Sequence, residues 1–254
     1  MKKIAVINQK GGVGKSTISV NLSYGLAKKG KRILLVDIDP QGHSSMIFIS
    51  EDKKKKDATI KELFIDQSFD ISNTILSAEV EDKPVKNLDV ISSDIHFARV
   101  AEQVYSRIHK EKILHNHFKK VDYDYVIMDC PPNLGVITIN AIYTADLILV
   151  PVNYDKGALD GMADLINTIK AVKETEDCPY LVLQNMFDSR NKQTNTYIDA
   201  QLEPFSKKLL TTKIRKSESL NQSRIVGEPV YTYDPQSNGV ADYEALAEEL
   251  IKNG

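Results

Sequence analysis

A glycine-rich segment near the N-terminus carries the residue types that bind phosphate. It runs through Lys10, Gly11, Gly12, Val13, Gly14, Lys15, Ser16 and Thr17. Glycines let the backbone turn tightly and point several N–H groups at phosphate oxygens. Lys15 can reach the β- and γ-phosphates of a nucleotide, and the Ser16 hydroxyl can ligate Mg²⁺. A glycine-rich turn that binds nothing is the alternative. These residues fall together between a predicted strand and a predicted helix, however, so we expect a site for ATP and Mg²⁺.

Three aspartates lie at the ends of apolar runs that are typical of buried strands. Asp37 ends one run, Asp39 follows it, and Asp129 ends another. Because the carboxyl ends of parallel strands meet at one edge of a sheet, we expect these side chains to converge near the phosphate loop. A single aspartate at such a position could simply cap loop amides. Three of them beside a phosphate loop favour a metal site, with Asp129 holding Mg²⁺ through coordinated water.

Short apolar runs alternate with helical patterns along the chain. The predicted strands are Ile4–Asn8, Arg32–Asp37, Tyr125–Asp129, Leu147–Val152 and Tyr180–Leu183. The predicted helices are Ser16–Lys29, Ile95–Ile108, Gly135–Thr144, Leu159–Lys173 and Thr194–Phe205. This alternation predicts an α/β fold with three layers, a mostly parallel twisted sheet and helices on both faces. We expect residues 1–254 to form a single domain.

Composition narrows the class of protein. The formal net charge is −2, from 33 basic and 35 acidic side chains, so nucleic-acid binding would need a local basic patch. Cys130 and Cys178 are too few for a disulfide framework, and we expect them to be small buried residues in a reducing cytoplasm. No apolar run reaches the length that spans a bilayer. The charged run Glu51–Lys56 is typical of a solvated surface loop.

The phosphate loop departs from the standard pattern of Gly, four residues and Gly-Lys-Ser/Thr. Gln9 stands where the first glycine belongs, and Lys10 follows it. The resulting KGGVGKS resembles the deviant phosphate loop of the ParA/MinD group of P-loop ATPases. In that group the extra lysine reaches across a dimer interface to the partner's nucleotide, and Lys10 is the matching position. The other interpretation is an exposed lysine that adds only local positive charge; the spacing favours the role across the dimer.

Two further segments resemble the switches of that group. LLVDIDPQGHSS is similar to the first switch, and this implies that Asp37 contacts the water shell of the metal while Asp39 orients the attacking water. DCPPNLG at 129–135 is similar to the second switch, and its prolines stiffen the chain beyond the strand.

The resemblance extends to the C-terminal region. The segments GEPV at 227–230 and YDPQSNG at 233–239 resemble the last loops of the chromosome- and plasmid-partitioning branch. Asn185 and Pro229 are by position the candidates for adenine contacts, although Asn185 could equally be a turn residue.

Other branches of the group fit the residues less well. Iron–sulfur members need cysteines that hold a cluster, and no Cys-x-x-Cys occurs here. The cell-division regulator MinD ends in a basic amphipathic helix that binds membrane, whereas this chain ends in the acidic DYEALAEELIKNG, so we expect no membrane partner. An ATP-dependent metabolic enzyme that acts on a small molecule remains the alternative, without a substrate motif to support it.

The remaining resemblance is to a ParA-type DNA-partition ATPase of the small type, without an N-terminal helix-turn-helix domain. It implies a cytoplasmic protein that hydrolyses ATP slowly with Mg²⁺. ATP would close two subunits into a homodimer that binds double-stranded DNA nonspecifically and is then nucleoid-associated. A centromere-binding partner of the ParB type would stimulate hydrolysis and release the dimer.

The candidate DNA surface is a basic segment between Lys207 and Arg224. The residues that we expect to contact DNA are Lys213, Arg215, Lys216 and Arg224. Arg215 matches an arginine position of the family, whereas Asn238 stands where some relatives have a further arginine. Since basic residues on a surface are often only solvated, both interpretations stay open.

Overall fold

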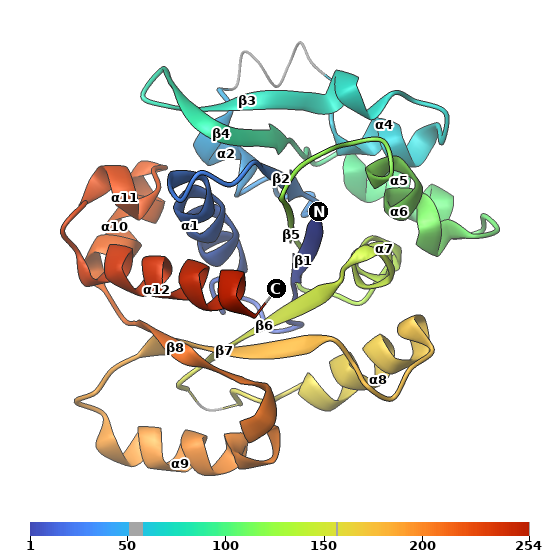
Figure 1. The fold of residues 1–254 in the computed structure, drawn as a ribbon. Coiled ribbons are helices and arrows are strands. Elements are labelled where there is room, and N and C mark those ends of the chain that lie inside the picture. Colours follow the sequence, from blue (N-terminus) through green and yellow to red (C-terminus); the bar gives the residue numbers. More distant parts are fainter. Residues whose placement is uncertain (51–57, 156, 254) are drawn as a thin grey trace.

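The computed structural model describes residues 1–50, 58–155 and 157–253, and Figure 1 shows how their helices and strands are arranged. The surface loop predicted at 51–56 lies outside these residues.

Within the described residues, eight strands form one sheet in the order β3-β4-β2-β5-β1-β6-β7-β8. Their bounds are β1 Lys2–Val6, β2 Ile33–Asp37, β3 Ile75–Val80, β4 Lys83–Ile91, β5 Tyr125–Asp129, β6 Leu147–Asn153, β7 Tyr180–Phe187 and β8 Leu209–Arg215. Neighbouring strands are parallel, except that β3 runs antiparallel to β4. The strands β2, β5 and β6 are buried along their whole length, which explains their continuous apolar runs.

Helices cover both faces of the sheet (Figure 1). Side chains from α1 (Lys15–Lys28), α2 (Ser45–Phe48), α11 (Val230–Tyr233) and α12 (Asn238–Lys252) form the apolar core on one face, and α10 (Glu218–Val226) packs beside α11. The other core is built from α4 (Ile60–Ile65), α5 (Phe97–Val104), α6 (Ile113–Phe118), α7 (Val136–Thr144), α8 (Met162–Lys173) and α9 (Lys192–Leu202). Short 3-10 helices are η1 (Ile71–Thr74), η2 (Lys110–Lys112) and η3 (Glu203–Lys208). The predicted three-layer α/β fold is confirmed.

Three strands were not predicted, and all lie toward the edges of the sheet. β3 and β4 form a hairpin with a β-bulge, and Glu81, Asp82 and Asn87 adopt positive φ. Polar residues and Pro84 interrupt the apolar pattern of β4 before Leu88, where this strand pairs with β3 and not yet with β2. β8, at the other edge, is half exposed and carries two threonines and a lysine.

No helix within the described residues is long and apolar enough to cross a membrane.

Candidate nucleotide site at the carboxyl edge of the sheet

The phosphate loop connects β1 to α1 and is fixed by side chains from neighbouring strands. Gly14 has a φ of 87° and caps the first turn of α1. A Cβ at Gly14 would lie 2.5 Å from Nδ2 of Asn185, so only glycine fits there. Asn185 donates a 2.8 Å hydrogen bond to the carbonyl oxygen of Val13. The loop amides at the helix N-terminus are thereby held in a shape that can bind an anion.

Two asparagines that sequence reasoning missed also shape this loop. The side chain of Asn8 accepts a hydrogen bond from the Lys10 amide (2.8 Å) and donates to the carbonyl oxygen of Pro151 (2.7 Å). Asn153, at the end of β6, donates to the carbonyl oxygen of Gly12 at 3.4 Å. A polar residue at the end of a buried strand was the available signal, and the prediction used it for the aspartates and for Asn185 but not for these two asparagines.

Lys15 lies against the loop with its side chain largely buried. Its Nζ is 3.3 Å from the carbonyl oxygen of Lys10, and the residue is 8% exposed. Burial lowers the pKa of Lys15, and the negative charge of Asp129 opposes this effect. An ammonium group in this position can neutralise phosphate oxygens that approach the loop, as predicted from the sequence.

Asp129 lies beside Asp37 at the carboxyl edge, where β5 and β2 are paired in register. Both carboxylates are fully buried. Oδ1 of Asp129 accepts a 3.2 Å hydrogen bond from Ser19, whereas Oδ2 is a buried acceptor without a partner within the described residues. Burial and the charge of Asp37 raise the pKa of Asp129, while the nearby hydroxyls of Ser16 and Ser44 oppose this shift. An unsatisfied carboxylate oxygen next to Ser16 fits the hydration shell of Mg²⁺.

Direct coordination by protein carboxylates alone does not fit this geometry. Within the described chain, no three Asp, Glu, His or Cys side chains are grouped closely enough to hold a metal ion. Mg²⁺ at such sites keeps several waters and takes further ligands from the nucleotide phosphates, so Ser16 and Asp129 are sufficient protein partners.

Both carboxylate oxygens of Asp37 accept hydrogen bonds from the segment that follows β2. Its Oδ1 accepts from the amide of Asp39 (3.1 Å), and its Oδ2 accepts from both the amide and the hydroxyl of Ser45 (2.8 Å each). Burial raises the pKa of Asp37, and the hydrogen bonds from Ser45 oppose that shift. The structure therefore gives Asp37 a role in holding the first switch, and its contact with the metal's water shell stays a prediction.

Asp39 lies at the mouth of the site and is 8% exposed. Its Oδ1 accepts a 2.9 Å hydrogen bond from the amide of Gln41. The role of Asp39 in orienting the attacking water stays a prediction.

Lys10 points away from Lys15 and toward the loop after β6. Its Nζ lies 2.5 Å from Oδ1 of Asp155, in an ion pair whose side chains are 29% and 50% exposed. The two lysines of the phosphate loop thus occupy different sides of it, and the role of Lys10 across a dimer stays a prediction.

The two candidate adenine residues lie close to the phosphate loop without a direct test of their role. Asn185 lies within β7, two residues before its end. Its side-chain amide donates a hydrogen bond to the carbonyl oxygen of Val13. Pro229 precedes α11, and the next amide, of Val230, donates to the side chain of Asn21 on α1 (2.8 Å). The C-terminal loop is thereby tied to the helix that begins at the phosphate loop.

The four candidate DNA residues lie at the carboxyl end of β8, on the same edge of the sheet, and on α10. Arg215 forms an ion pair with Asp242, with Nη2 at 2.6 Å from Oδ1. Nζ of Lys213 lies 3.8 Å from Asp199 and over the ring of Phe187. Lys216 and Arg224 are exposed. Two of the four charges are therefore compensated by acids, which sequence spacing did not reveal.

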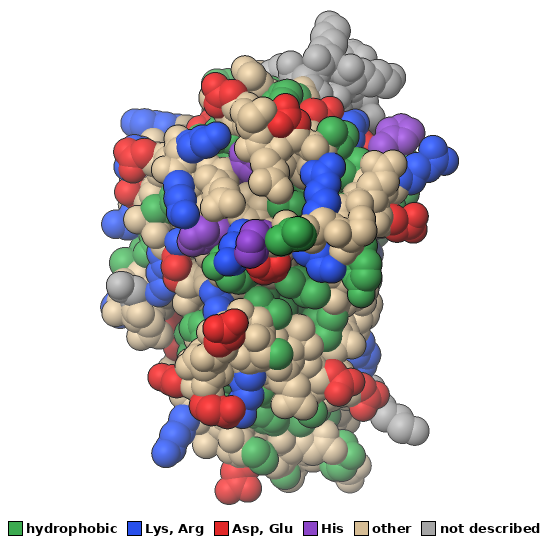
Figure 2. All heavy atoms as spheres, turned by 90° about the vertical axis from the view of Figure 1, so that its right-hand side faces the viewer, with side chains coloured by type: hydrophobic (Ala, Val, Ile, Leu, Met, Phe, Trp, Pro, Cys, Tyr) green, Lys and Arg blue, Asp and Glu red, His purple; other side chains and the backbone are tan. Residues whose placement is uncertain are grey.

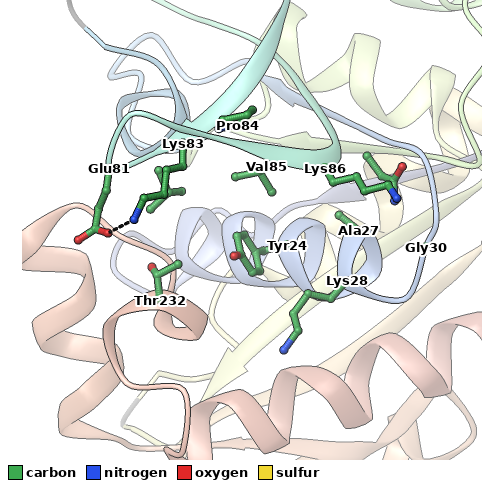
Figure 3. A pocket seen from close by; sticks show the side chains of 12 residues that line it. Tyr24, Ala27, Lys28, Gly30, Glu81, Lys83, Pro84, Val85, Lys86 and Thr232 are labelled. Carbon is green, nitrogen blue, oxygen red and sulfur yellow. Dashed lines mark ion pairs between the residues drawn. The ribbon is translucent and has the colours of Figure 1, made fainter.

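A hollow of about 510 Å³ lies between the second half of α1 and the β3–β4 hairpin (Figure 3). Tyr24, Lys28 and Thr232 line one side of it, and Lys83 and Lys86 line the other. It includes none of the predicted nucleotide residues, because the phosphate loop lies at the opposite end of α1.

Known proteins resemble this chain over its whole length. Residues 1–180 match a family model described as an AAA domain. The sporulation initiation inhibitor protein Soj of Bacillus subtilis (strain 168) is 37% identical over 258 residues, which cover 100% of this chain and 99% of Soj. The chromosome partitioning protein ParA of Myxococcus xanthus is 32% identical, over 98% of this chain and 87% of that protein.

Solved structures share the fold. A putative plasmid partition protein from Borrelia burgdorferi B31, bound to AMPPNP, has a TM-score of 0.82 at 25% identity and covers 100% of this chain and 99% of its own. Cobyrinic acid a,c-diamide synthase from Mycobacterium smegmatis, with a bound ATP analogue and magnesium, has a TM-score of 0.82 at 24% identity, with 100% and 95% coverage. The P-loop NTPase fold implied by the sequence is confirmed, and the chain belongs to the ParA/Soj family of P-loop partition ATPases.

Proposed function

We propose that this chain is an ATP-switched DNA-segregation ATPase. ATP and Mg²⁺ bind between the phosphate loop and the carboxylates at the ends of β2 and β5, and two copies then close over two nucleotides. The dimer binds duplex DNA without sequence preference and, when ATP-bound, associates with the nucleoid. A centromere-binding partner of the ParB type accelerates the slow hydrolysis and so releases the dimer.

The observation that carries this proposal is the arrangement of charge around the phosphate loop. Lys15 and the unsatisfied oxygen of Asp129 supply a phosphate contact and a magnesium-water contact on one side. Lys10 pairs with Asp155 of its own subunit and its side chain is 29% exposed, so a second subunit could approach it. A composite site of this kind couples nucleotide binding to dimer formation, because a ligand shared by two subunits binds only the associated state.

A metabolic ATP-dependent enzyme is the second candidate. The structural likeness to cobyrinic acid a,c-diamide synthase supports it, since the same fold with ATP and magnesium serves a small-molecule reaction in that protein. The greater sequence identity to Soj and ParA favours the partition function.

Retention on unrelated duplex DNA distinguishes the two. We expect the wild-type protein to be retained on duplexes of different sequence with ATP and Mg²⁺, and released with ADP. Lys15→Gln is the matched control, because it removes the phosphate contact while leaving the surface intact. Absence of DNA retention under every nucleotide condition would favour the metabolic enzyme.

A further inference from the structure

Four lysines gather around Tyr143 and His115 at the amino edge of the sheet, opposite the nucleotide site. We call them the lysine cluster: Lys3, Lys112, Lys119 and Lys173. Nζ of Lys112 lies 5.7 Å from the centroid of the Tyr143 ring, and the His115 ring packs edge-on against the same tyrosine. Nζ of Lys173 lies 2.9 Å from the carbonyl oxygen of Tyr143. α6 and α7 belong to the side of the molecule that Figure 2 shows, where histidines lie among lysines and arginines.

The positive charge of this cluster is only partly compensated. Nζ of Lys173 donates to the carbonyl oxygens of Tyr143 and Ala145, which carry no net charge. Lys3 does have an acid partner, Asp146, at 2.7 Å. Glu111 lies 3.9 Å from Nζ of Lys112, beyond the range of a strong hydrogen-bonded pair.

The field at His115 gives independent support. Burial lowers its pKa, the charges of Lys119, Lys3 and Lys173 lower it further, and the charge of Asp146 opposes them. Of the three acids in the nearby α8–β7 turn, Glu176 pairs with Lys170 and Asp177 with Lys208, while Glu174 directly follows Lys173 in the chain. The surface near His115 is therefore electropositive.

We propose that the lysine cluster binds the phosphate backbone of duplex DNA. Lysines act on phosphates as point charges, and this sequence-independent contact is what nonspecific binding requires. The inference rests on the proposed function and adds to it a second DNA-contacting surface, on the opposite edge of the sheet from the nucleotide.

The position of the cluster has a consequence for the dimer. If two subunits close over the nucleotide edge, their amino edges face outward on opposite sides of the assembly. Each subunit then keeps Lys112 and Lys119 at its surface, whereas the Lys3 side chain is only 17% exposed and Lys173 is half-buried. The dimer carries two such clusters. Because the two clusters face opposite sides of the assembly, one straight duplex cannot contact both, and each cluster binds its own stretch of DNA.

The test is the charge-reversing variant Lys112→Glu/Lys119→Glu. Its matched control is Lys83→Glu/Lys86→Glu on the β3–β4 hairpin, which changes the net charge by the same amount at exposed positions. DNA retention with ATP and Mg²⁺ is measured on two unrelated duplexes across a salt series. Melting temperature and ATP binding are measured on every protein to establish that the fold and the site are intact.

We expect the Lys112→Glu/Lys119→Glu protein to lose affinity for both duplexes equally, with the slope of log affinity against log salt reduced by about two, or about 0.9 for each phosphate contact. The control should behave as the wild type. Equal losses in both variants would mean that only net charge matters and would overturn the proposal, as would wild-type affinity in the Lys112→Glu/Lys119→Glu protein. If the wild-type protein binds no DNA at all, the proposed function is wrong. That result differs from the two above, which contradict only the role of the lysine cluster.

Discussion

The ammonium group of Lys10 lies 2.5 Å from the carboxylate of Asp155, a residue that follows it by 145 positions in the chain. The pair connects the phosphate loop to the segment after β6. For Lys10 to reach a nucleotide in a second subunit, this ion pair must open. In the proposed mechanism, the pair would therefore oppose dimer formation.

Two variants test that relationship. Lys10→Ala should still bind ATP but dimerise poorly, because a desolvated charge that pairs across an interface is worth about 2–5 kcal/mol. Asp155→Ala should dimerise at a lower ATP concentration than the wild type. Light scattering with ATP and Mg²⁺ measures both, with Asp164→Ala on α8 as a control for removing an exposed acid nearby. Wild-type dimerisation in Lys10→Ala would reduce this lysine to local positive charge.

Asp39→Ala should separate hydrolysis from binding. Asp39 contributes little to ground-state affinity if it only positions water, so the variant should bind ATP, dimerise and turn over about 100-fold more slowly. Sizing with ATP should show a dimer that persists for longer than that of the wild type. Unchanged turnover would place the water-positioning group elsewhere.

The buried pair of Asp37 and Asp129 predicts a pH dependence of the nucleotide-free protein. Burial and the charge of Asp37 raise the pKa of Asp129 to about 7, against about 3.9 for an unfolded aspartate. Between these values the native state holds a proton that the unfolded state has released, so the free energy of unfolding falls as the pH rises.

The melting temperature of Asp129→Asn minus that of the wild type should therefore increase as the pH rises from about 5 to about 7. His117, whose pKa is lowered by burial, is common to both proteins and cancels in the comparison. Parallel curves of melting temperature against pH would contradict the raised pKa.

The DNA candidates on β8 and α10 need variants chosen from the structure. Arg215→Glu would place a carboxylate against Asp242, which is 7% exposed. We expect it to lose about 1–3 kcal/mol of folding stability, discounted because Arg215 is itself half exposed. Lys216→Glu/Arg224→Glu should keep the wild-type melting temperature and weaken DNA retention with ATP. Retention equal to the wild type in that double variant would remove this segment from the DNA surface.

The sequence predicted the nucleotide edge well because its determinants are local. A buried strand shows as an apolar run, a phosphate loop shows as glycines before a lysine, and parallel pairing brings Asp37 and Asp129 together. The β3–β4 hairpin was missed because β4 alternates polar and apolar residues and includes Pro84. Strands of that kind are only half buried and carry a weak apolar signal.

Charge compensation could not be predicted from spacing. Arg215 is neutralised by Asp242, 27 positions later, and Lys213 lies near Asp199, which belongs to a different helix. Such pairs depend on how α12 and α9 pack beside β8, and a local sequence pattern does not predict that packing. The basic segment read from the sequence was therefore less positive than its composition indicated.

The most direct test of the account mixes two inactive variants. Lys10→Ala should lack the lysine that completes the partner's site, and Asp39→Ala should lack the water-positioning group while still supplying Lys10. In a mixed dimer, the site of the Lys10→Ala subunit keeps its own Asp39 and receives Lys10 from its partner, so one complete site forms. We predict that the mixture hydrolyses ATP faster than either variant alone at the same total concentration. A rate equal to the average of the two separate proteins would contradict a nucleotide site shared between two copies of this chain.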